Sequence, residues 1–196
     1  MEKIILKYID FYKCSSSLLL IGFLWIISIV LVRAKAIPQE PFQTIILIID
    51  LYLTLYVYLG FVKFSLIEKK DFFRIIIFAV MALAVIHSLI SKISFFYKFL
   101  GVPFAIDCIL LYYAFKSVEN SKIIYFRKLS RLYLYLLFFY VPISVSLLFG
   151  KESLKKFIPQ MLIKPFIILA LFWAALIVYT WYMKIKLFKQ ISRQMY

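Results

Sequence analysis

The sequence predicts an all-α membrane protein, a polytopic bundle of six transmembrane helices. Of its 196 residues, 65% are hydrophobic and only 17% are charged, and the mean hydropathy is +0.98. Soluble domains average about 45–50% apolar and about 25% charged residues, so a soluble fold of this length cannot bury so much apolar surface. The apolar residues also form continuous runs, whereas the strands of a membrane barrel alternate polar and apolar positions.

Six apolar runs approach the roughly 17–25 residues that a helix needs to cross the hydrocarbon core. We expect the spans at about 15–32, 42–62, 72–90, 99–115, 132–149 and 166–183. The remainder forms short loops and two tails, so residues 1–196 are expected to be a single integral membrane domain. The first run has features of a cleavable leader, but Arg33 and Lys35 directly after it favour a retained helix.

Both tails, 1–13 and 184–196, are predicted to be amphipathic helices lying on the lipid surface. In the second tail, apolar and basic residues take opposite faces at helical spacing, a pattern typical of interfacial helices. The apolar residues of that tail are Ile185, Phe188, Ile191 and Met195, and the basic ones are Lys186, Lys189 and Arg193.

The charge distribution predicts the orientation and the partners of the chain. Sixteen Lys and Arg residues fall on the side that holds both tails, and eight fall on the other side. By the positive-inside rule both termini are cytoplasmic, in a multi-pass protein of the plasma (inner) membrane. The formal charge of +15 lies in short loops between apolar runs. Anionic lipid headgroups at the cytoplasmic face are therefore the expected partner, rather than nucleic acid. The sequence leaves open whether the chain also binds a protein partner or forms a homo-oligomer.

A repeated motif suggests internal duplication of helical hairpins. Pro41-Phe42, Pro103-Phe104 and Pro165-Phe166 open the second, fourth and sixth runs at equal spacing. Proline suits the first turn of a helix, where its missing N–H is not needed. The alternative is that apolar helices of similar composition look alike without common descent.

Two ionisable residues lie inside the predicted second and third spans. Asp50 lies about 12 Å below the outer end of its span, and His87 lies near the outer end of the next. An ionisable group within a span costs at least about 2.5–3.5 kcal/mol on insertion scales, which makes such residues candidates for function. Because the two spans form a hairpin, Asp50 and His87 are predicted to face each other and to bind a proton, a cation or a small solute. The structural alternative is a buried hydrogen bond.

Three further residues complete the candidate ligand site. Asp107 is expected in the first turn of the fourth span, where the helix dipole would stabilise its charge. Ser88 and Ser91 flank His87 and would extend the polar patch, unless they bond back to their own helix. No metal site and no cofactor are expected, because the chain has two cysteines and one histidine.

These observations favour a small protein of the transport type, which binds or passes a small solute or ion near the Asp50–His87 pair. In span number, length and orientation the chain resembles the six-helix substrate-binding components of vitamin importers. The first run reads Leu18-Leu19-Leu20-Ile21-Gly22 and lacks their small-residue contact motif, so no membership is assigned. The alternative function is a non-catalytic subunit or scaffold of a larger membrane complex. An enzyme is not expected, because no hydrolase or protease motif is present.

Overall fold

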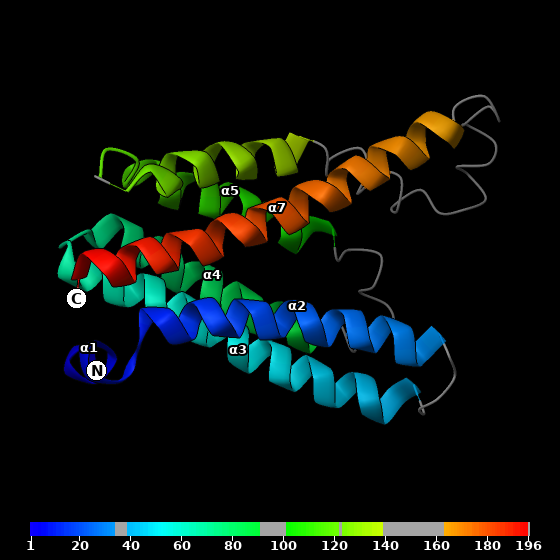
Figure 1. The fold of residues 1–196 in the computed structure, drawn as a ribbon, viewed down its shortest axis with the longest axis horizontal. Coiled ribbons are helices and arrows are strands. Elements are labelled where there is room, and N and C mark those ends of the chain that lie inside the picture. Colours follow the sequence, from blue (N-terminus) through cyan, green and yellow to red (C-terminus); the bar gives the residue numbers. More distant parts are fainter. Residues whose placement is uncertain (34–38, 91–100, 122, 139–162, 196) are drawn as a thin grey trace.

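The computed structural model describes residues 1–33, 39–90, 101–121, 123–138 and 163–195. Every regular element in these ranges is a helix, so the all-α class is confirmed for the described part of the chain (Figure 1). The helices are α1 (Glu2–Tyr8), α2 (Phe11–Arg33), α3 (Gln39–Ile67), α4 (Asp71–Ile90), α5 (Gly101–Ser117), a helical segment at 124–138, and α7 (Ile163–Met195).

Three described helices are long and apolar enough to cross a membrane, over Thr44–Ile67, Asp71–Leu89 and Leu171–Gln194. A shorter apolar stretch runs over Phe11–Leu24. The chain is therefore a membrane protein with transmembrane helices. The number six stays a prediction, because the expected spans 99–115 and 132–149 extend into residues outside the described ranges.

The three Pro-Phe motifs mark helix starts, as predicted. Pro41, Pro103 and Pro165 are each the third residue of their helices, α3, α5 and α7. The first turn of a helix has N–H groups without intrahelical partners, so proline costs no hydrogen bond there. Whether the motifs record a duplication stays a prediction.

The helices close into a ring. Helix α2 packs on α3 and α7, and α4 packs on α3 and α5. Segment 124–138 joins α5 to α7, because the Tyr133 ring stacks on Phe115 and lies beneath the Lys184 ammonium. We call one end of the bundle the basic end; it holds α1, the α3–α4 turn, residues 118–121 and the C-terminal turn of α7 (Figure 1).

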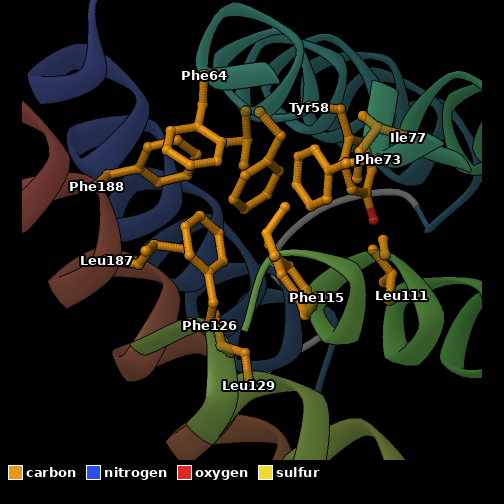
Figure 2. Close-up of a cluster of buried hydrophobic side chains, with 14 of the residues drawn as sticks. Tyr58, Phe64, Phe73, Ile77, Leu111, Phe115, Phe126, Leu129, Leu187 and Phe188 are labelled. Carbon is orange, nitrogen blue, oxygen red and sulfur yellow. The ribbon is translucent and has the colours of Figure 1, made fainter. Parts of the chain in front are cut away.

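A cluster of buried phenylalanines fills the bundle towards the basic end. Phe61 lies at its centre, with its ring centroid 4.7 Å from Phe188 and 5.4 Å from Phe115. Figure 2 shows rings from several helices converging there. Buried aromatic rings contribute large apolar areas and favourable edge-to-face contacts. This aromatic cluster consists of Phe11, Phe61, Phe64, Phe73, Phe115, Phe126 and Phe188.

Close approach between helices around the cluster requires a glycine. A Cβ atom built on Gly60 of α3 would lie 2.6 Å from Cys14 Sγ and 2.9 Å from a ring carbon of Phe188. Any larger side chain at residue 60 would therefore push α2 and α7 away from α3.

The C-terminal tail differs from its prediction as a separate interfacial helix. Residues 184–195 are the last part of the continuous helix α7. Leu187, Phe188 and Ile191 are fully buried against the bundle, so the apolar face that was expected to lie on lipid packs on protein. The periodicity was read correctly, but periodicity alone does not distinguish a lipid partner from a helical one.

The N-terminal tail forms the short helix α1, which is fixed to the bundle by polar contacts. The buried Lys63 ammonium donates a hydrogen bond of 2.6 Å to the Ile9 carbonyl, at the break between α1 and α2. A cation stabilises the unpaired carbonyls at a helix C-terminus. Arg74 of α4 also forms an ion pair with Glu2 at 3.2 Å.

Candidate functional site

A charged cavity of about 160 Å³ lies between α2, α3 and α7. Its lining combines charged and aromatic side chains, and the residues from each helix recur at helical spacing, so that each helix contributes one face. The lining residues are Leu18 and Ile21 of α2, Asp50, Thr54, Val57 and Tyr58 of α3, and Trp181 and Lys184 of α7.

Lys184 is the most deeply placed cation of this site. Its side chain is 8% exposed, and its ammonium lies 5.4 Å from the ring centroid of Tyr133 and 6.0 Å from that of Tyr58. Cation–π attraction compensates part of the free energy lost when an ammonium leaves water. Burial of a charge still needs anionic partners, because desolvation costs several kcal/mol per ion.

The Asp107 carboxyl group of α5 lies near Lys184. The two side chains interact electrostatically, although no direct ion pair joins them in the described part of the chain. Asp107 Oδ1 is buried and has no hydrogen-bond partner among the described residues. Such an acceptor is costly to bury unless something donates to it.

The position of Asp107 corrects the dipole explanation. Helix α5 begins at Gly101 and has no acidic residue in its first turn. Asp107 therefore lies in the second turn, where the effect of the helix terminus has largely fallen off. The helix dipole therefore does not explain the position of Asp107. The electrostatic interaction of Asp107 with Lys184 explains it better.

Asp50 is half-buried on α3 and lines the same cavity as Lys184. The cavity lining thus brings the Asp50 carboxylate of α3 and the Lys184 ammonium of α7 together with the Tyr58 side chain. Asp107 of α5 interacts with Lys184 but is not among the residues that line the cavity. This arrangement can take up a proton or a small ion, because it places a carboxylate in a polar hollow within a membrane bundle.

His87 stands apart from this cavity. Asp50 and His87 lie about equally far from the α3–α4 turn, but His87 is not among the residues that line the charged cavity. The Ser88 hydroxyl donates a hydrogen bond of 2.9 Å to the Ala84 carbonyl of its own helix, and Ser91 lies outside the described residues. A direct contact between Asp50 and His87 therefore stays a prediction.

The aromatic cluster lies on the basic-end side of the cavity. On each of α2, α3 and α7, one phenylalanine of the cluster lies one or two turns nearer the basic end than the cavity residues of that helix. These phenylalanines are Phe11, Phe61 and Phe188. A dry aromatic constriction excludes water and ions. In this conformation the cavity is thus separated from the basic end by packed rings.

Sequence reasoning missed Lys184 as a site residue and placed it in the tail. One signal was present in the sequence: Lys184 shares a helical stripe with Trp181, Phe188 and Ile191, at spacings of three, four and seven residues. A lysine on an apolar stripe of a membrane helix must find partners inside the bundle or extend to the interface.

Comparison of the chain with family models, with curated proteins and with solved structures finds no match. The function is therefore inferred from the site itself. Within the described ranges, no group of three or more His, Cys, Asp or Glu side chains could hold a metal ion.

Proposed function

We propose that the protein is a small membrane protein of the transport type, which binds a small cation, the proton included, at the charged cavity and passes it across the bilayer. The observation that carries this proposal is the presence of Asp50 and Lys184 in one cavity between membrane-spanning helices. The same proposal includes six membrane spans and the placement of both termini in the cytoplasm. The sequence-based Asp50–His87 centre is replaced by Asp50, Asp107 and Lys184.

The size and charge of the cavity favour a small cation over an organic solute. Sites for drug-sized ligands usually measure about 300–1,000 Å³, whereas this cavity measures about 160 Å³. The Asp50 carboxylate in the cavity lining can accept a proton or coordinate a small cation. Charged groups inside a membrane bundle commonly mark ion paths and proton relays.

Passage needs a second conformation, because the aromatic cluster closes the cavity towards the basic end. The moving parts are then the contacts of α7 with α2 and α3, where Phe188 meets Phe11 and Phe61. Rocking of one group of helices against another around a fixed site is the usual route of alternating access.

Cation binding can be tested by the thermal stability of the purified protein. Unfolding is followed in Na⁺, K⁺, Li⁺ or the bulky N-methylglucamine cation, at constant ionic strength and at several pH values. A ligand that binds only the folded state raises the apparent Tm by mass action. We expect the Tm of the wild type to rise with one small cation or with protonation, and Asp50→Asn to lose this dependence.

The matched control is Glu68→Gln, which removes an exposed carboxylate at the α3–α4 turn and is expected to respond like the wild type. Equal responses of the wild type and Asp50→Asn would overturn the proposal. If that result came with a stoichiometric protein partner in native mass spectrometry, the chain would instead be a non-catalytic subunit or scaffold.

A further inference from the structure

A second, larger hollow lies between segment 124–138 and the last turns of α7, at the basic end. It measures about 460 Å³ and we call it the basic groove. Four cations line it, and none of the described residues that line it is acidic. Its lining residues are Ile124, Tyr125, Lys128, Lys186, Lys189, Gln190 and Arg193.

On both helices the basic residues of the groove continue an exposed aromatic stripe. Along α7, the stripe runs at helical spacing through Phe172, Tyr179 and Tyr182 to Lys186, Lys189 and Arg193. Along segment 124–138, it runs from Phe138 and Tyr135 to Arg131 and Lys128. Each stripe changes from aromatic to basic on approaching the basic end, as expected where a membrane surface meets water.

Two of the three lysines of the groove lie against tyrosine rings. The Lys186 ammonium is 4.7 Å from the ring centroid of Tyr182, and the Lys128 ammonium is 5.9 Å from that of Tyr125. A lysine that rests on an interfacial tyrosine holds its charge at the level of the lipid headgroups.

We propose that the basic groove binds the phosphate headgroup of an anionic phospholipid, with the acyl chains lying along the two aromatic stripes. The four cations are opposite in sign to such a headgroup, and basic hollows between membrane helices are suited to these lipids. Free phosphate shares the headgroup chemistry, but only a lipid also uses the exposed aromatic residues next to the groove. This proposal is independent of ion passage through the charged cavity.

The test is native mass spectrometry of the full chain, titrated with phosphatidylglycerol or with phosphatidylcholine. The groove variant is Lys186→Gln/Lys189→Gln/Arg193→Gln. The control variant is Lys3→Gln/Lys7→Gln/Lys13→Gln, which removes the same charge from exposed residues of α1 and α2. At about 1 kcal/mol per cation near a lipid surface, loss of three cations weakens binding about a hundredfold.

We expect stoichiometric phosphatidylglycerol on the wild type and on the control variant, and about a hundredfold weaker binding by the groove variant. A charge-conserving variant, Lys186→Arg/Lys189→Arg, should retain the lipid, which separates loss of charge from misfolding. Equal loss in the groove and control variants would overturn the proposal, because the binding would then be a general charge effect. Displacement of the lipid by millimolar inorganic phosphate would assign the groove to free phosphate instead, and a copurifying acidic protein in place of lipid would also overturn it.

Discussion

Lys184 is the residue on which the account of the site depends most. Its ammonium is buried among α3, α5, segment 124–138 and α7, where it interacts with the Asp107 carboxyl group. A buried charge that loses its partner is strongly destabilising, whereas removal of both charges costs less. The two residues should therefore be coupled in their effect on stability.

A double-mutant cycle measures this coupling. We expect Lys184→Met and Asp107→Asn each to lower the free energy of unfolding by about 1–3 kcal/mol, because each leaves one buried polar group less well compensated. The double variant should lose less than the sum, with a coupling free energy of about 0.5–3 kcal/mol. Denaturation in mixed micelles provides the four values, and strictly additive losses would show that the two charges do not interact.

At the residue scale, the sequence made Asp50 and Asp107 candidates because a charge inside an apolar run is conspicuous. It did not identify Lys184, which lies at the end of its run and could equally have reached the interface. The sequence predicted a contact between Asp50 and His87 because both residues fall in the outer half of the hairpin formed by the second and third predicted spans. Level along a helix does not determine which neighbour a side chain faces, because each residue rotates by about 100° from the last.

At the element scale, the helices were largely predictable from the sequence. Continuous apolar runs and the prolines at 41, 103 and 165 mark the bodies and starts of α3, α5 and α7. It was less predictable whether the apolar face of a helix packs on another helix or on lipid. The C-terminal turns of α7 pack on protein rather than on a lipid surface, because Leu187, Phe188 and Ile191 complete the core.

Two neighbouring phenylalanines at the start of α4 test which faces are packed. Phe73 and its contact Phe61 are fully buried, whereas Phe72 is 61% exposed. We expect Phe73→Ala to lower the free energy of unfolding by about 3–5 kcal/mol, because it leaves a cavity in the aromatic cluster. Phe72→Ala, the control, should change it by no more than about 0.5 kcal/mol, as for other exposed positions. Similar losses of stability in both variants would contradict the assignment of Phe73 to the core and of Phe72 to the surface.

At the scale of the whole molecule, the arrangement is a ring of helices with three layers along its length. The charged cavity lies within the bundle, the aromatic cluster lies on its basic-end side, and the basic groove lies at the basic end itself. The composition predicted the membrane class, since 65% hydrophobic residues leave no alternative. Closure of the ring by segment 124–138 depends on contacts between distant residues, which periodicity does not encode.

Ion flux in proteoliposomes tests the central claim most directly. The protein is reconstituted with pyranine, or with a Na⁺- or K⁺-sensitive dye, inside, and the internal concentration of the matching ion is followed after a proton, Na⁺ or K⁺ gradient is imposed. The account predicts a flux above that of protein-free liposomes, its loss in Asp50→Asn with the helical content unchanged, and a flux in Glu68→Gln equal to that of the wild type. A wild-type flux no greater than that of empty liposomes, or an undiminished flux in Asp50→Asn, would contradict the assignment of the charged cavity as the path of the ion.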